Sequence, residues 1–209
     1  MKKQSGFTLI ELMVTLVIAG TLYAIAGPSI TDVVSGKRSV ATTNELLAAL
    51  HIARSEAIKL NKRVTICESN NGTSCSSTGK WEDGWIVFVD SLGAASGSTG
   101  SACANTTSNC LLRVHGKIND DKVTIRGLDQ DSNTVNAFTF TSRGLPKNNA
   151  GNGQSGVFSV CNKESGGGDF FRVVALSFSG RVRVSEESTI TSASSAGNTT
   201  AISCPPSGP

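Results

Sequence analysis

The pattern of hydrophobic and polar residues divides the chain into three parts, of which the first is the most apolar. Residues 7–26 form an unbroken run with a single charge, Glu11, and the run ends at Gly27 and Pro28. At about 1.5 Å per residue, a helix of this length spans roughly the 30 Å hydrocarbon core of a bilayer. The pattern therefore predicts a membrane-spanning helix over residues 7–27.

The second part, residues 28–62, is amphipathic. Its apolar residues recur at helical spacing, at Leu46, Leu50, Ala53, Ala57 and Leu60, while charged residues occupy the other faces. We expect this segment to continue the first helix, with a weak point at Gly27 and Pro28.

From residue 63 onward the hydrophobic period changes to two. Short β-rich runs alternate with loops of Gly, Ser and Asn, at residues 63–67, 85–90, 111–115, 122–126, 137–141, 157–161, 172–178 and 181–184. Without helical patterns between them, such runs predict antiparallel sheet. The expected fold class is α+β: a long N-terminal helix packed against an antiparallel β domain over residues 63–184, with a tail over residues 185–209.

The charge balance limits the nucleic-acid chemistry that the chain can support. The net charge is +3 over 209 residues, and Lys2 and Lys3 supply two of these charges. The remaining chain is close to neutral, so any affinity for nucleic acid must come from a local basic patch.

The six cysteines favour disulfides in an oxidising compartment, because they are even in number and lie in polar surroundings. They are Cys67, Cys75, Cys103, Cys110, Cys161 and Cys204. Zinc binding is the alternative, but no CxxC pair is present and the two histidines are isolated from the cysteines. Many pairings are open; the favoured ones are Cys67 with Cys75 and Cys103 with Cys110, which leaves Cys161 with Cys204 in the tail.

No arrangement of residues suggests catalysis. His51 falls on the predicted helix and His115 at a strand end, and neither belongs to a triad-like pattern. The segment from Gly166 to Asp169 lacks the Lys-Ser/Thr of a phosphate loop and predicts a hairpin turn instead. We therefore expect neither an enzyme nor a bound cofactor or metal.

One stretch near the C-terminus does suggest binding chemistry. Strand alternation in FSGRVRV places Val182 and Val184 toward the core and Arg181 and Arg183 outward, roughly 6.6 Å apart along the strand. Gly180 permits a tight turn beside them. Two neighbouring guanidinium groups suit successive phosphates. The alternative is a solvated strand face whose arginines pair with the two glutamates that follow.

The N-terminal sequence MKKQSGFTLIELMVTLVIAG resembles the leader and first helix of type IV pilins and of type II secretion pseudopilins. The resemblance implies a leader over residues 1–6, cleavage between Gly6 and Phe7 by a prepilin peptidase, and methylation of Phe7. It also implies that Glu11 meets the free N-terminal amine of a neighbouring subunit in a filament. The alternatives are a secretory signal peptide, which fits the long apolar run poorly, and an acid that snorkels to the membrane surface.

Three further stretches narrow the resemblance within this group. The segments WEDGWIVFVD, from Trp81 to Asp90, and FTFTSRGLP, from Phe138 to Pro146, resemble FimT and pseudopilin H proteins. Independently of that likeness, both faces of the strand WIVFV are apolar, which predicts a central, buried strand. Gly180, Arg181 and Arg183 match the C-terminal motif of FimT-like minor pilins.

The resemblance to FimT-like minor pilins implies a minor type IV pilin that binds extracellular double-stranded DNA, without sequence specificity, for natural transformation. The alternatives are a structural minor pilin for pilus assembly and initiation, and pseudopilin H of type II secretion. The expected partners are double-stranded DNA, other major and minor pilins, prepilin peptidase and the inner membrane. The basic leader predicts a cytoplasmic N-terminus, with the β domain in the periplasm and later on the pilus.

Overall fold

The structure is a computed structural model that describes residues 7–90, 110–148, 150–163, 169–185, 189–191 and 199–201. One long helix, α1 (Leu9–Leu60), precedes a short 3-10 helix, η1 (Trp81–Asp83), and a series of strands. The strands are β1 (Val64–Glu68), β2 (Trp85–Val89), β3 (Leu111–His115), β4 (Val123–Asp129), β5 (Ala137–Phe140), β6 (Pro146–Lys147), β7 (Gly156–Lys163), β8 (Asp169–Leu176), β9 (Val182–Ser185), β10 (Thr189–Thr191) and β11 (Thr199–Ala201).

Helix α1 is continuous over 52 residues. It begins after Thr8, whose side chain caps the first turn, and it ends at Asn61, whose φ of 51° places it in the left-handed conformation that commonly terminates helices. The helix passes through Gly27 and Pro28, so the predicted weak point does not end it. The two helical segments expected from the sequence therefore form one element.

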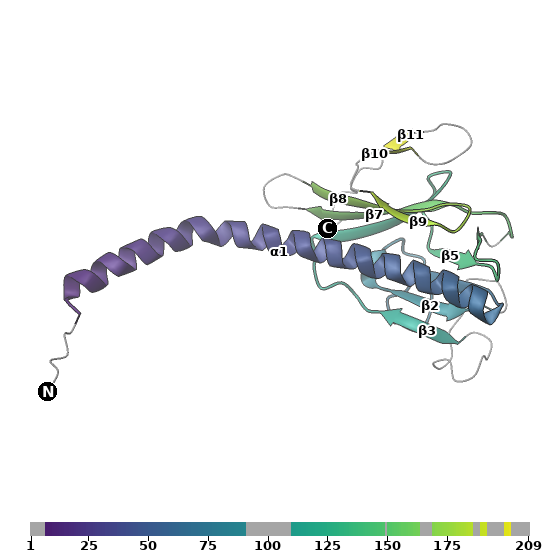
Figure 1. Ribbon diagram of the computed structural model, residues 1–209, viewed down its shortest axis with the longest axis horizontal. Coiled ribbons are helices and arrows are strands. Elements are labelled where there is room, and N and C mark those ends of the chain that lie inside the picture. The colour runs from purple at the N-terminus through teal and green to yellow at the C-terminus, as the bar shows by residue number, and fades with distance from the viewer. Residues whose placement is uncertain are drawn as a thin grey trace.

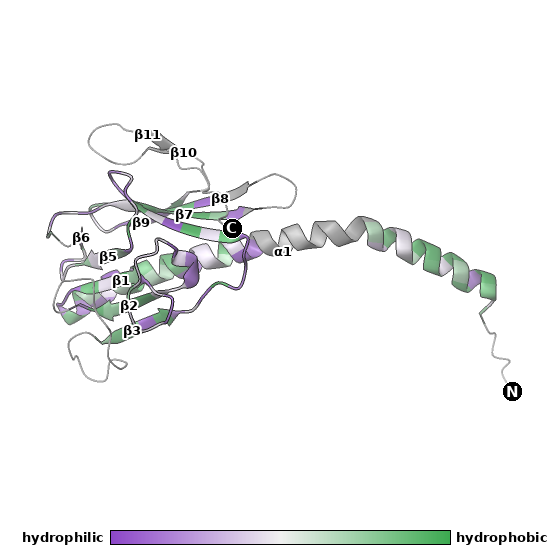
Figure 2. Cartoon of the chain, turned by 180° about the vertical axis from the view of Figure 1, so that it is seen from behind, coloured by the Kyte–Doolittle hydropathy of each residue, from purple (hydrophilic) through white to green (hydrophobic). Residues whose placement is uncertain are grey.

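The two ends of α1 have different surroundings. Residues 7–24 are exposed, and Figures 1 and 2 show this apolar end of the helix projecting away from the β domain. From Ser39 onward, one face of the helix is buried against the strands. In the described part of the chain, no helix is both long and apolar enough to cross a membrane. The inner-membrane span over residues 7–27 stays a prediction.

The C-terminal half of α1 packs with one face against two antiparallel sheets. One sheet has the strand order β3-β2-β1-β5-β6 and the other has the order β4-β7-β8-β9. The helix contacts strands of both sheets, and Figure 1 shows β2 and β3 on one side of it and β7, β8 and β9 on the other. The predicted fold class, a long helix packed against antiparallel sheet, is confirmed.

Strand β2 contributes to hydrophobic clusters on both of its faces, as its sequence predicts. Trp85, Val87 and Val89 belong to the main core between the sheets and α1. Ile86 and Phe88 belong to a smaller cluster on the opposite face. All five side chains are buried, so this part of the WEDGWIVFVD segment is core.

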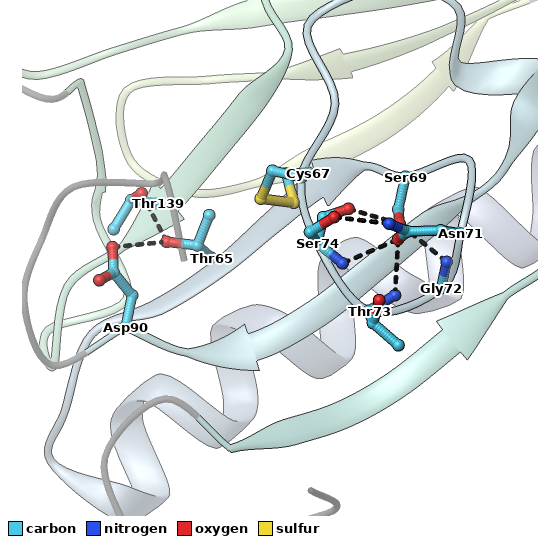
Figure 3. Close-up of a disulfide and its surroundings, with 10 residues drawn as sticks. Thr65, Cys67, Ser69, Asn71, Gly72, Thr73, Ser74, Asp90 and Thr139 are labelled. Carbon is cyan, nitrogen blue, oxygen red and sulfur yellow. Dashed lines mark hydrogen bonds between the residues drawn. A yellow bond between two sulfur atoms is a disulfide. The ribbon is translucent and has the colours of Figure 1, made fainter. Parts of the chain in front are cut away.

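A disulfide between Cys67 and Cys75 lies in the smaller cluster, and this predicted pair is confirmed. Figure 3 shows the loop that it closes, in which Asn71 organises the turn: its side-chain oxygen accepts hydrogen bonds from the backbone N–H groups of Thr73 and Ser74, both at 2.9 Å. The loop is thus fixed by covalent and hydrogen bonds together.

The remaining cysteines are consistent with further disulfides. Cys110 and Cys161 are both disulfide-bonded, and none of the described cysteines is free. Their expected partners, Cys103 and Cys204, lie outside the described residues. These two pairings stay predictions.

Candidate functional site

The Gly-Arg-x-Arg stretch begins in a tight hairpin turn between β8 and β9. The N–H of Ser177 donates to the carbonyl oxygen of Arg181 at 3.0 Å, and the N–H of Gly180 donates to the carbonyl oxygen of Ser177 at 2.8 Å. Gly180 has φ +74°, a conformation that a three-residue hairpin loop requires at this position and that glycine adopts without strain. The sequence-based prediction of a turn at Gly180 is confirmed.

Helix α1 and the turn between β5 and β6 both contact this hairpin turn. A Cβ at Gly180 would overlap the carbonyl oxygen of Gly144 and would lie 3.1 Å from Nε of Arg54. Nη2 of Arg54 donates to the carbonyl oxygen of Ser179 at 3.2 Å. Gly180 therefore serves two needs at once, a left-handed backbone and close contact between chain segments.

Arg181 and Arg183 are both exposed. Arg181 ends the turn, and Arg183 lies in β9, which is the outer strand of its sheet. Among the described residues, neither side chain forms an ion pair or a side-chain hydrogen bond. Glu186 and Glu187, the acids that could neutralise them, lie outside the described residues.

The two valines of this strand follow the prediction only in part. Val182 packs against the main core, as alternation predicts. Val184 remains 36% exposed, although it pairs with the fully buried Val174 of β8. Among the described strands, β9 pairs with β8 alone, and its residues Arg183 and Val184 are exposed.

The N-terminal residues singled out by the sequence lie apart from this turn. Phe7 is 85% exposed, and Gly6 falls outside the described residues. Glu11 lies in the first turn of α1, where its N–H donates to Oγ1 of Thr8 at 3.4 Å. This position gives Glu11 a local role as well, because a carboxylate in the first turn interacts favourably with the positive end of the helix dipole.

The two histidines also separate in the structure. His51 is exposed on α1. His115 stacks on Trp85 with ring centroids 3.8 Å apart, and its Nε2 lies 2.8 Å from Oε2 of Glu45 on α1. This contact could not be predicted from the sequence, because Glu45 and His115 are 70 positions apart. It joins the helix to the edge strand β3 and has no catalytic partner among the described residues.

The turn at residues 177–181 has a signal in the local sequence. In three turns, at residues 141–145, 148–152 and 177–181, a Ser, Thr or Asn is followed three positions later by Gly. In each turn the glycine has a left-handed backbone, and its N–H donates to the carbonyl oxygen of the first residue. In each case the side-chain oxygen of the first residue also accepts from the N–H of the last. The spacing is readable in the sequence as TSRGL, NNAGN and SFSGR.

Residues 42–180 match the family profile described as "Type II transport protein GspH", which covers more than half of the chain. The chain belongs to the GspH family. Residues 1–26 match a second profile, described as a prokaryotic N-terminal methylation motif. Both matches agree with the resemblance seen in the sequence, and together they identify a pilin-like protein of the minor pilin and pseudopilin group.

Relatives of this GspH-family protein are found among pilus proteins. Two Pseudomonas aeruginosa proteins, each named fimbrial protein, are 31% identical to it over 125 residues, which is 52% of this chain and 80% of each relative. Two crystal structures of the Pseudomonas aeruginosa type IV minor pilin FimU also match this chain. The first is 22% identical in sequence, covers 69% of this chain and 90% of FimU, and has a TM-score of 0.44. The second is 21% identical, covers 70% of this chain and 92% of FimU, and has a TM-score of 0.41.

Membership of the GspH family sets the general role of the protein. Pilins and pseudopilins are structural components of filaments and are not enzymes. Other pilins are the partners that the family suggests, and the methylation motif implies processing of the leader. The protein is therefore a minor type IV pilin or a pseudopilin.

Proposed function

We propose that this protein is a minor type IV pilin that binds extracellular double-stranded DNA, without sequence specificity, during natural transformation. The observation that carries the proposal is the pair of exposed arginines, Arg181 and Arg183, at the hairpin turn of an exposed sheet edge. Neither side chain forms an ion pair with a residue that the structure describes, and both are exposed to solvent, where a phosphate could reach them. The match of Gly180, Arg181 and Arg183 to the FimT-like motif supports the same ligand.

The chemistry of the pair favours phosphate contacts over base contacts. Arginine forks bind phosphate oxygens in bidentate fashion, and such contacts carry no sequence information. Each neutralised phosphate releases condensed counterions, so the affinity should fall steeply as salt rises. Two contacts alone give weak binding, so a filament or a membrane would need several copies to retain DNA.

The N-terminal segment supplies the assembly part of the proposal. Prepilin peptidase cleaves between Gly6 and Phe7, and Phe7 is methylated, in keeping with the methylation motif over residues 1–26. Residues 7–27 then hold the precursor in the inner membrane. The exposed apolar side chains of this segment pack against other pilins in the filament, where Glu11 meets a neighbour's N-terminal amine.

The salt dependence of DNA binding tests the proposed function. We would measure the binding of the mature chain, in a non-ionic detergent, to a fluorescent duplex by anisotropy over a series of salt concentrations. The double variant Arg181→Gln/Arg183→Gln should flatten the plot of log affinity against log salt by about two units, because two phosphate contacts are lost. If the variant binds as the wild type does at every salt concentration, the site is not at these arginines.

A second candidate function has its own support. The family profile that matches residues 42–180 is named for a type II transport protein, which favours a pseudopilin of a secretion system or a minor pilin that only helps to assemble the filament. Deletion of the gene separates these roles. Loss of transformation with pili intact supports DNA binding, loss of pili supports the assembly role, and loss of secretion supports the pseudopilin.

A further inference from the structure

The turn at residues 177–181 has a structural counterpart beside it, at residues 141–145. There the N–H of Thr141 donates to the carbonyl oxygen of Leu145 at 2.9 Å, and the N–H of Gly144 donates to the carbonyl oxygen of Thr141 at 2.8 Å. Gly144 has φ +73° where Gly180 has φ +74°. The two loops are therefore the same kind of hairpin turn, each with its glycine at the fourth position.

The two turns touch each other and share one support. The carbonyl oxygen of Gly144 lies so close to Gly180 that no Cβ fits between them. Nε of Arg54 would lie 3.1 Å from a Cβ at either glycine. We refer to residues 141–145 and 177–181 together as the twin turn. The two loops are thus joined by a backbone contact between the two sheets and by a side chain of the helix.

The contact places a third arginine next to the two of the Gly-Arg-x-Arg stretch. Arg143 immediately precedes Gly144, and Arg181 immediately follows Gly180, so the pair of touching glycines brings the two residues to one edge of the domain. Arg143 is exposed and, within the described residues, has no ion pair or side-chain hydrogen bond. The twin turn thus carries two exposed cations, Arg143 and Arg181, and Arg183 follows in β9.

Four lysines and arginines elsewhere in the described part of the chain form ion pairs with acidic side chains. Ion pairs join Arg38 with Asp120, Lys59 with Glu56, Lys117 with Asp83, and Arg126 with Glu82. No such pair involves a described residue of the twin turn. In the part of the chain that the structure describes, the edge formed by the twin turn thus carries cations without an ion pair, which suits an anionic ligand.

We propose that Arg143 is a third DNA-contacting residue and that the DNA surface extends across the twin turn, from β9 to the turn between β5 and β6. This inference rests on the proposed function, and it adds a contact that lies outside the Gly-Arg-x-Arg stretch. The duplex lies across both turns, with phosphates of its backbone at Arg143 as well as at Arg181 and Arg183. Because the backbone of the two turns is already formed, the conformational entropy lost on contact falls mainly on the arginine side chains.

The test is the salt dependence of duplex binding by the full mature chain in detergent, with single variants. Arg143→Gln should flatten the salt slope by about one unit, as Arg181→Gln and Arg183→Gln should. Arg143→Lys retains the charge and should keep the wild-type slope. The matched control is Arg113→Gln, because Arg113 is also an exposed arginine but lies in β3, at the opposite edge of its sheet from β6. That variant should bind as the wild type does.

The outcomes distinguish failure of the inference from failure of the proposed function. If Arg143→Gln keeps the wild-type slope while Arg181→Gln lowers it, the extended surface is wrong and the proposed function stands. If Arg113→Gln lowers the slope as much as Arg143→Gln does, binding follows net charge and the twin turn has no special part. If the wild type shows no salt-dependent binding at all, the proposed function fails and the inference fails with it.

Discussion

Position 180 requires glycine for two separate reasons. The backbone has φ +74°, which costs a residue with a Cβ about 1–2 kcal/mol, and the carbonyl oxygen of Gly144 occupies the space that a Cβ would need. Gly151 has a similar backbone, with φ +82°, but nothing lies within 4 Å of its Cβ position. The two glycines therefore separate the cost of the backbone conformation from the cost of crowding.

We predict that Gly180→Ala destabilises the domain by about 3 kcal/mol and Gly151→Ala by about 1 kcal/mol. The larger value adds an overpacking cost of typically 1–3 kcal/mol to the backbone cost. Urea denaturation of both variants, monitored by tryptophan fluorescence, would measure the two free energies of unfolding. Equal losses for the two variants would mean that the contact between Gly180 and Gly144 adds no constraint.

Helix α1 is one element with two different energetic roles. Its C-terminal half buries a face of small and apolar side chains between the two sheets, and Leu50 in this face is fully buried. In its N-terminal half the large apolar side chains are exposed, and Leu12 is 57% exposed. The stability of the β domain should therefore depend on the C-terminal half alone.

We predict that Leu50→Ala lowers the free energy of unfolding of the domain by about 3 kcal/mol, because it removes buried methyl groups and leaves a cavity. Leu12→Ala should change it by less than about 0.5 kcal/mol, as substitutions outside the core usually do. Chemical denaturation in the same detergent would compare them. A similar loss from both would show that the N-terminal half packs on the domain in solution.

The strands were largely predictable from the sequence, and the division into sheets was not. Each of the eight predicted β-rich runs overlaps an observed strand, because alternation of apolar residues reports burial of a strand face. Alternation does not report which strands pair. The packing of α1 against two separate sheets is therefore visible only in the structure. The two-residue strand β6 gave too short a pattern to detect.

The candidate site shows the same limit at finer scale. The turn at Gly180 and the exposure of Arg181 and Arg183 follow from local sequence. The support from Arg54 and the neighbouring turn does not, because Arg54 and Ser179 are 125 positions apart. Contacts of this kind depend on how whole elements pack.

The whole molecule combines a weak candidate DNA site with a segment proposed for membrane and filament assembly. We predict that the apparent affinity for DNA rises at least about 100-fold when the mature chain is reconstituted densely in liposomes, because one duplex can then bind several copies. The measurement is the apparent affinity for a labelled duplex at several protein-to-lipid ratios. The duplex should be longer than the spacing between chains on the liposome.

A matched variant and a clear counter-result make this measurement decisive. Arg181→Gln/Arg183→Gln liposomes at the same density should show much less of the rise, because each copy then contributes fewer phosphate contacts. An affinity per chain that does not change with density would contradict binding by several copies at once.

The hydrogen bond from Arg54 to the carbonyl oxygen of Ser179 has a mechanical meaning. A ligand pulled away from the twin turn applies tension to the β8–β9 hairpin, and a hairpin under tension at its tip can unzip one hydrogen bond at a time. Arg54 ties this tip to α1 near the end of the helix, at 3.2 Å. Part of the load therefore passes directly into the helix, which runs the length of the molecule to the end proposed for assembly (Figure 1). If the twin turn holds DNA as proposed, Arg54 gives force on the DNA a direct route from the tip of the hairpin into the helix.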